Sequence, residues 1–402
     1  MPKFSERAIN LPASPIRKLV PFADAAKERG THVYHLNIGQ PDIATPPEYF
    51  QAIEAADIKT LAYSPSAGTD SLREQIAAYY GRLGHAVSNE QVITTTGASE
   101  ALGFVFAALM NPGDEVIVPE PFYANYLSFT LGKDAKIVPV TSNIENSFAL
   151  PPMEAFEAKI TERTKAILIC NPGNPTGVLY PEQALNQLAE ICQKHDLFLI
   201  SDEVYREFAY DGLTHKSVLG LEKIQENTIV VDSISKRFSA CGARIGCVVS
   251  RNEELLGLVT KMAQARLSPP TFGQIGAAAV YQLPADYYAS VASEYSQRRD
   301  LLKSALDEME GVVCPNVNGA FYAMVQLPID DSEKFCRWML EEFQHENATV
   351  MMAPAGGFYA TEGLGANQVR IAYVLNQDDL AAAMHCLKIG LSKYPGRTTN
   401  PN

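Results

Sequence analysis

The amino-acid sequence predicts an α/β protein: a mainly parallel central sheet sandwiched by helices, joined to a smaller α+β domain. Short runs of β-branched and aliphatic residues alternate with longer helical patterns through the middle of the chain, which is typical of strands linked by crossover helices. These runs are apolar at nearly every position rather than at alternate ones, as expected for strands buried on both faces. From about Ala285 longer helices and fewer strands follow, and this change marks the second domain.

The predicted strands of the central sheet follow one another between residues 92 and 232. They are Val92–Thr96, Glu115–Val118, Lys136–Val140, Lys165–Cys170, Leu197–Ser201 and Thr228–Asp232. Helices are predicted between them, over about 99–109, after 123, after 152 and from 181. Because ligands of parallel sheets bind beyond the carboxyl ends of the strands, we expect functional residues directly after positions 96, 170, 201 and 232.

The chain of 402 residues is long enough to form two domains. A large domain is predicted for residues 46–285. A small domain is predicted to combine residues 1–45 with 286–402, using a long helix at Tyr287–Glu310, short strands near Phe321 and Thr349, and a final helix from about Gln377.

Composition and charge exclude several classes of protein. The net charge of −13 without a basic cluster argues against a nucleic-acid partner. The longest apolar run, Ala101–Met110, is about half of what a membrane span requires, and the first residues contain no apolar signal-peptide core, so a cytoplasmic protein without membrane contact is expected. Seven cysteines without a CxxC pair, and histidines without HExxH, predict neither a disulfide framework nor a metal site.

Four motifs stand where the predicted strands end. They are Thr96-Gly-Ala-Ser-Glu100, Asn171-Pro-Gly-Asn-Pro-Thr-Gly177, Ser201-Asp-Glu-Val-Tyr205, and Ser233-Ile-Ser-Lys236 followed by Gly242-Ala-Arg-Ile-Gly246. Taken singly, each has an ordinary explanation: a helix start, a turn, a helix cap or a solvated charge. Taken together, their order and spacing are highly specific.

This combination resembles the class I aminotransferase family, which has the aspartate aminotransferase fold of the fold type I pyridoxal-phosphate enzymes. The resemblance runs from Asn37-Ile-Gly-Gln-Pro-Asp42 to Val369-Arg-Ile-Ala-Tyr373. It implies pyridoxal 5′-phosphate as cofactor and transfer of an amino group from an L-amino acid to a 2-oxo acid, with the aspartate/2-oxoglutarate type as the first hypothesis.

The resemblance implies catalytic roles for Lys236, Asp202 and Tyr205, and a cofactor-binding role for Asn174. Lys236 would bind the cofactor aldehyde as an imine and then, released by substrate, move the proton between Cα and C4′. Asp202 would keep the pyridine nitrogen protonated, so that the ring accepts electrons. Tyr205 and Asn174 would hydrogen-bond the phenolic oxygen of the cofactor and so tune the pKa of the imine.

The resemblance also implies a set of binding residues. Arg244 and Ser233, with the backbone amides of Ala98 and Ser99, would hold the phosphate, and Tyr123 would stack on the pyridine ring. In the same way, Arg370 would bind the substrate α-carboxylate bidentately, with Asn174 nearby and with Gly39 leaving room for the substrate.

One further match implies a homodimer. Tyr63, in Tyr63-Ser-Pro-Ser-Ala-Gly68, corresponds to the family tyrosine that reaches the phosphate of the neighbouring subunit. If so, neither subunit has a complete site alone.

The amino donor is left open by the sequence. One aspartate-specific branch of the family has a lysine where this chain has Ser99, so Arg17 is a candidate for a second carboxylate. Aromatic, alanine-type and branched-chain donors are alternatives, as is a lyase on the same fold, either β-eliminating or of the aminocyclopropane-carboxylate-synthase type. A DNA-binding regulator with this fold is disfavoured because the motifs begin near Asn37. An inactive relative is disfavoured because six side chains of the family site are all present: Lys236, Asp202, Tyr205, Asn174, Arg244 and Arg370.

Overall fold

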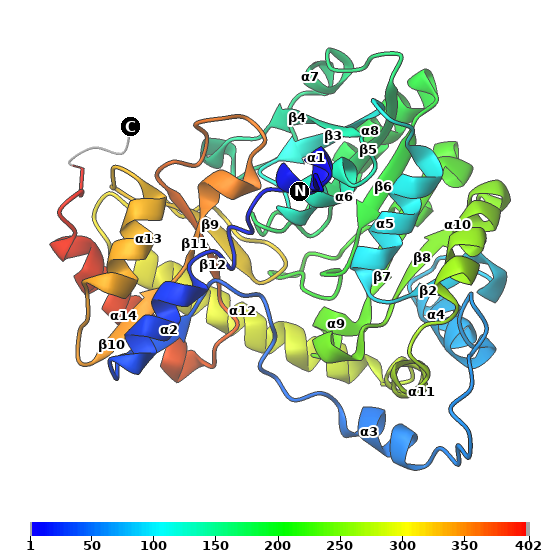
Figure 1. Ribbon diagram of the computed structural model, residues 1–402, viewed down its shortest axis with the longest axis horizontal. Coiled ribbons are helices and arrows are strands. Elements are labelled where there is room, and N and C mark those ends of the chain that lie inside the picture. Colours follow the sequence, from blue (N-terminus) through cyan, green and yellow to red (C-terminus); the bar gives the residue numbers. More distant parts are fainter. Residues whose placement is uncertain (1, 399–402) are drawn as a thin grey trace.

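The computed structural model describes residues 2–398, and its centre is a seven-stranded sheet with the order β2-β8-β7-β6-β5-β3-β4 (Figure 1). The strands are β2 (Val92–Thr95), β3 (Glu115–Glu120), β4 (Lys136–Thr141), β5 (Thr164–Cys170), β6 (Phe198–Asp202), β7 (Thr228–Ser233) and β8 (Gly246–Ser250). Strand β8 is antiparallel to both of its neighbours, and the other pairs are parallel. The predicted class, an α/β protein with a mainly parallel sheet, is confirmed.

Helices cover both faces of this sheet, and each face has its own apolar core. On one face, α4 (Asp70–Arg82), α8 (Glu182–His195) and α11 (Thr271–Val280) bury residues such as Ile167, Leu199 and Val230. On the other face, α5 (Ala98–Leu109), α6 (Asn125–Leu131) and α10 (Glu253–Arg266) bury Leu168, Ile200 and Val231. Adjacent residues of one strand thus enter opposite cores, which is why the strands are apolar throughout.

The C-terminal third and the N-terminal segment form a separate group of elements at the left of Figure 1. It contains an antiparallel sheet of β11 (Ala353–Pro354), β12 (Gln368–Ala372) and β9 (Tyr322–Gln326), and a parallel pair of β1 (His32–His35) and β10 (Ala348–Met351). The helices around them are α2 (Val20–Glu28), α12 (Ala285–Asp307), α13 (Ser332–Glu341) and α14 (Gln377–Lys393).

The boundaries of the two domains remain a proposal, and the packing supports it. One apolar core joins Leu19, Leu36 and residues from 291 to 394, and it also includes Val204, Tyr205, Phe208 and Tyr210 of the other group. By contrast, α3 (Pro47–Glu54) packs on α11 of that other group. We therefore use large domain for residues 46–285 and small domain for residues 1–45 and 286–402. Within the described residues, none of the helices combines the length and the apolar content needed to cross a membrane.

The N-terminal segment lies across the gap between the two groups of elements (Figure 1). Near α1 (Glu6–Ile9), Arg7 forms an ion pair of 3.1 Å with Asp134 after α6, and farther along Lys18 pairs with Glu333 of α13 at 2.6 Å. The segment between these two ion pairs contains Arg17 and is held against both domains.

A buried carboxylate forms a second connection between the domains. Glu120, at the end of β3, accepts hydrogen bonds from Thr141 Oγ1 (2.8 Å), from the backbone N–H groups of Ala360 (2.8 Å) and Thr361 (3.1 Å), and from Thr361 Oγ1 (2.6 Å). The side chain is 0% exposed. Two residues beyond it, the N–H of Phe122 donates to the carbonyl of Phe358 at 2.9 Å.

Candidate active site

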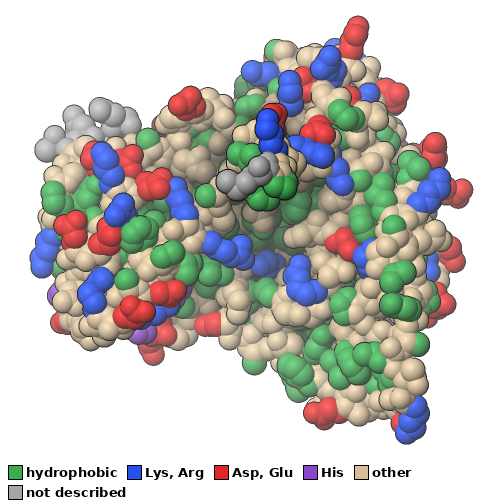
Figure 2. Space-filling model, in the orientation of Figure 1, with side chains coloured by type: hydrophobic (Ala, Val, Ile, Leu, Met, Phe, Trp, Pro, Cys, Tyr) green, Lys and Arg blue, Asp and Glu red, His purple; other side chains and the backbone are tan. Residues whose placement is uncertain are grey.

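A cavity of about 450 Å³ lies at the carboxyl ends of β5, β6 and β7, between the two domains. Figure 2 shows the hollow, with cationic side chains at its edge. Twelve of the thirteen residues predicted for the site line it: Arg17, Gly39, Ala98, Ser99, Tyr123, Asn174, Asp202, Tyr205, Ser233, Lys236, Arg244 and Arg370. The exception is Tyr63, whose side chain is 79% exposed.

Lys236 belongs to α9 (Ile234–Arg237), a single helical turn that follows β7 directly. Ser233 caps this turn, because its hydroxyl oxygen accepts the N–H of Ser235 at 3.1 Å. The Lys236 ammonium donates to the carbonyl of Gly39 at 2.7 Å and lies 3.9 Å from Cys241 Sγ. Burial lowers the pKa of Lys236 below its ordinary value, and the neighbouring arginines act in the same direction. The side chain is therefore biased toward the neutral amine that a nucleophile requires.

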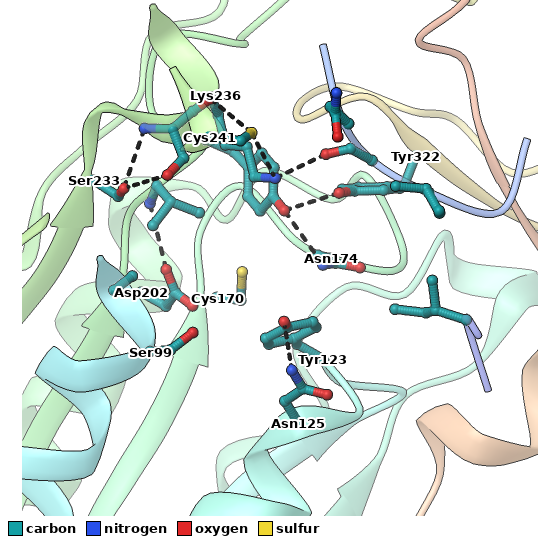
Figure 3. Close-up of a pocket in the computed structure, with 18 of the residues that line it drawn as sticks. Ser99, Tyr123, Asn125, Cys170, Asn174, Asp202, Ser233, Lys236, Cys241 and Tyr322 are labelled. Atoms are coloured by element: carbon teal, nitrogen blue, oxygen red, sulfur yellow. Dashed lines mark hydrogen bonds between the residues drawn. The ribbon is translucent and has the colours of Figure 1, made fainter. Parts of the chain in front are cut away.

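Asp202 is the last residue of β6 and is buried in the wall of the cavity (Figure 3). Its carboxylate accepts the hydroxyl proton of Tyr126 at 2.8 Å and the N–H of Val204 at 3.4 Å. Burial raises the pKa of Asp202 to about 6, although these two hydrogen bonds act against the increase. In the described part of the chain, no lysine or arginine forms an ion pair with it. A buried carboxylate of this kind suits a protonated ring nitrogen.

Arg370 of β12 is 1% exposed and faces the cavity from the small domain. Its guanidinium donates to Asn174 Oδ1 at 2.9 Å and to the carbonyl of Asn37. It lies over the rings of Tyr322 and Phe358, with distances of 4.5 and 4.9 Å to the ring centres. Its Nε has no hydrogen-bond partner among the described residues. A fixed, buried guanidinium with a free donor is suited to a carboxylate ligand.

The end of the cavity at α5 offers donors for a phosphate. Gly97 precedes the helix with φ +77°, and a Cβ atom there would overlap the guanidinium of Arg244. The turn leaves the amides of Ala98 and Ser99 as the first two of α5, and such amides have no acceptor within their own helix. Arg244 is held by donating to the carbonyls of Cys241 (3.1 Å) and Thr96 (3.5 Å). These groups fit an anion at the helix N-terminus.

Ser233 and Tyr123 complete the predicted cofactor residues. The hydroxyl of Ser233 donates to the carbonyl of Ile245 at 2.8 Å and lies 2.8 Å from Ser235 Oγ. The hydroxyl of Tyr123 accepts from Asn125 Nδ2 at 2.8 Å, which leaves the ring as a wall of the cavity (Figure 3).

Gly39 lines the cavity, as expected. A Cβ atom at this position would overlap the hydroxyl of Tyr322. The missing side chain therefore makes room for a tyrosine of the protein, and its role beside the substrate stays a prediction.

Some residues of the site were not predicted. Among them, Tyr322, Asn125 and Cys241 line the cavity, and Tyr126 donates to Asp202 without lining it; none belongs to the motifs from which the site was inferred. Tyr126 and Tyr322 lie in apolar stretches of the sequence that contain no motif, where a tyrosine looks like an ordinary core residue. Cys241 is three residues before Arg244, and its proximity to Lys236 follows only from the turn between them.

The fold and this set of side chains are those expected of a pyridoxal-phosphate enzyme. Residues 31–387 match the family model described as aminotransferase class I and II, and the chain belongs to that family. It is a pyridoxal-phosphate-dependent aminotransferase, as its resemblance predicted.

Relatives of similar length support the assignment. The chain is 31% identical to an aspartate aminotransferase of Bacillus subtilis, covering 98% of this chain and 100% of that one, and 32% identical to an aspartate aminotransferase of Pyrococcus horikoshii, covering 96% and 97%. Its structure superimposes on a single mutant of Thermus thermophilus aspartate aminotransferase with a TM-score of 0.89 at 29% identity, covering 97% and 100% of the chains. An alanine aminotransferase from Pyrococcus furiosus gives the same TM-score and identity, covering 98% and 100%.

Proposed function

We propose that this aminotransferase uses L-aspartate as amino donor and 2-oxoglutarate as acceptor. The names of the Bacillus and Pyrococcus horikoshii relatives support this choice. The equal structural similarity to an alanine aminotransferase means that the residues of the cavity must carry the argument.

The observation that carries the proposal is the convergence of three arginines on one cavity. Burial raises the pKa of Tyr123, and Asp202 raises it further, while Arg370, Arg17 and Arg244 all lower it. Tyr123 is thus within the electrostatic reach of all three cations. Cofactor and aspartate together carry three anionic groups: the phosphate, the α-carboxylate and the side-chain carboxylate. Each can pair with one arginine, namely Arg244, Arg370 and Arg17 in that order.

The remaining roles follow from position. When bound, the cofactor supplies an electron sink that stabilises negative charge at the substrate Cα. Lys236 is at the right place to hold the cofactor covalently and, once released by substrate, to move a proton from Cα with its Nζ. Asp202 holds the proton on the ring nitrogen, because its own ionised form needs a positive partner in this buried position. Arg370 orients the substrate through its α-carboxylate.

We also propose a homodimer in the cytoplasm, with Tyr63 reaching the site of the neighbouring subunit. Tyr63 lies beside other exposed apolar side chains: Leu61 is 59% exposed, Leu267 49% and Phe272 43%. Gln274 Nε2 donates to Ser64 Oγ at 2.8 Å, so these two segments form one surface. Apolar side chains gathered in this way favour burial against a second copy.

A panel of amino donors tests the substrate. The first half-reaction is followed by the loss of the visible absorbance of the lysine-bound cofactor, with aspartate, alanine, aromatic and branched-chain donors. The formation of glutamate from 2-oxoglutarate then distinguishes amino transfer from β-elimination. We expect aspartate to react with the highest kcat/KM.

Arg17→Ala tests the second carboxylate site, with Lys18→Ala as the matched control because that cation pairs with Glu333 instead. We expect Arg17→Ala to lower kcat/KM for aspartate roughly two- to fivefold, as loss of an exposed ion pair of about 0.5–1 kcal/mol would do, and to leave alanine unaffected. An equal effect on both donors, or none, would contradict the assignment of Arg17.

A further inference from the structure

Tyr322 contacts both Tyr205 and Arg370, although it belongs to none of the sequence motifs. Its hydroxyl lies 2.9 Å from the hydroxyl of Tyr205, and its ring lies under the guanidinium of Arg370. Asn174 forms a parallel connection, since Oδ1 accepts from Arg370 at 2.9 Å and Nδ2 donates to Tyr205 at 3.4 Å. Figure 3 shows Tyr322 and Asn174 on the same side of Lys236.

The directions of the two hydrogen bonds of Asn174 can be derived from Arg370. A guanidinium only donates, so the atom of Asn174 that faces Arg370 must be the carbonyl oxygen. The amide nitrogen of Asn174 then faces Tyr205 and also only donates. The oxygen of Tyr205 is therefore already an acceptor on its Asn174 side.

The contact between the two tyrosines can have either direction, because each hydroxyl can donate or accept. Tyr322 is 2% exposed, and among the described residues its hydroxyl has no hydrogen-bond partner other than Tyr205. In the direction that we assign, Tyr322 donates its proton to Tyr205. The one proton of Tyr205 is then left for an acceptor in the cavity.

We propose that Tyr322 is a positioning residue that makes Tyr205 a hydrogen-bond donor toward the bound cofactor. The inference rests on the proposed role of Tyr205 beside the phenolic oxygen of the cofactor. A donated proton at that oxygen lowers its negative charge and so lowers the pKa of the lysine-bound cofactor nitrogen. Tyr322 thereby favours the deprotonated form of the resting enzyme.

Gly39 is part of the same arrangement. The hydroxyl of Tyr322 occupies the space that a Cβ of residue 39 would need, and the carbonyl of Gly39 holds the Lys236 amine at 2.7 Å. A methyl group at position 39 would push the Tyr322 hydroxyl away from its place, and it gives a second way to disturb the contact.

The test is a pH titration of the visible absorbance of the cofactor-loaded protein. Wild type is compared with Tyr322→Phe, which keeps the ring under Arg370 and removes only the hydroxyl. Tyr373→Phe is the matched control, because this buried hydroxyl donates to the carbonyl of Ala320 at 3.1 Å, outside the cavity. We expect the titration midpoint of Tyr322→Phe to rise by roughly 0.5–1 pH unit, as loss of one hydrogen bond would give, and that of Tyr373→Phe to stay at the wild-type value.

In steady-state kinetics, Tyr322→Phe should affect kcat/KM but not KM. KM for the amino donor should change little, because Arg370 keeps its aromatic neighbour. The acidic limb of the pH profile of kcat/KM should shift to higher pH together with the titration midpoint. A merely structural role would lower thermal stability in both tyrosine variants without moving the midpoint.

The outcomes separate this inference from the function on which it rests. If the absorbance of wild type titrates but the midpoint of Tyr322→Phe is unchanged or lowered, only the inference about Tyr322 is overturned. A lowered midpoint would mean that Tyr205 donates to Tyr322. If Tyr322→Phe fails to fold, Gly39→Ala must show the upward shift instead, and its absence is equally decisive. A wild type whose absorbance does not depend on Lys236 overturns the proposed site as a whole.

Discussion

The substitution Asp202→Asn should stabilise the cofactor-free protein at high pH and lose this advantage as the pH falls. The carboxyl is buried without a cationic partner, and its pKa is raised from 3.8 to about 6. In the folded state it therefore binds its proton more tightly than in the unfolded chain. Such a group contributes stability below about pH 3.8 and loses that contribution as the pH rises through about 6.

The magnitude follows from the same two values. A difference of about two pH units at 1.36 kcal/mol each corresponds to roughly 3 kcal/mol over the whole range. From pH 5 to about pH 6 the carboxyl is protonated in the folded protein but already ionised in the unfolded chain. The free energy of unfolding of wild type should therefore change by about 1.4 kcal/mol between pH 5 and pH 8 because of this group. The amide of asparagine does not titrate, and the hydroxyl of Tyr126 can accept from it as readily as it donates to the carboxylate.

The assay is urea unfolding of both cofactor-free proteins at pH 5 and pH 8, at one protein concentration because association affects apparent stability. The free energy of unfolding of Asp202→Asn, relative to wild type, should increase from pH 5 to pH 8. A difference that is constant or decreases over this range would refute the reasoning that burial raises the pKa of Asp202. Adding cofactor should reverse the order, because only the carboxylate can hold a proton on the ring nitrogen.

Two further predictions concern Lys236 and Tyr63. Lys236→Ala should still bind cofactor, without the absorbance of the lysine-bound form, and should lose turnover by roughly 10³-fold or more; retained turnover would contradict its role. Mixing Lys236→Ala with Tyr63→Ala should restore activity, because a heterodimer has one site with both residues intact, about a quarter of all sites after random assortment. Unchanged low activity of the mixture, with heterodimers present, would show that Tyr63 does not act across the interface.

The strands of the large domain were predictable because their apolar runs are continuous. All six predicted strands are present, with ends within one or two residues, from Val92–Thr95 to Thr228–Ser233. The strand Gly246–Ser250 was not predicted, and neither was its antiparallel direction. A short apolar run such as Cys247–Val249 looks the same whether the strand is parallel or antiparallel, since its direction is set by where the preceding chain returns to the sheet.

The candidate site was predictable where a motif fixes the spacing. Asp202 and Tyr205 are three residues apart, and Ser233 and Lys236 lie in one turn, so local geometry alone brings each pair to the cavity. Tyr322 and Tyr126 come from elements whose position depends on tertiary packing. A single tyrosine in a strand or helix gives no signal of a partner that is distant in the sequence.

The Glu120 connection determines how the two domains can move. Four hydrogen bonds converge on this buried carboxylate, and removing such donors from a charged group is costly. The N-terminal segment adds ion pairs with exposed side chains, such as Arg7–Asp134, where both partners are about half exposed, and such pairs are weak. Lifting this segment off the two domains therefore costs less free energy than separating the domains at Glu120, Ala360 and Thr361.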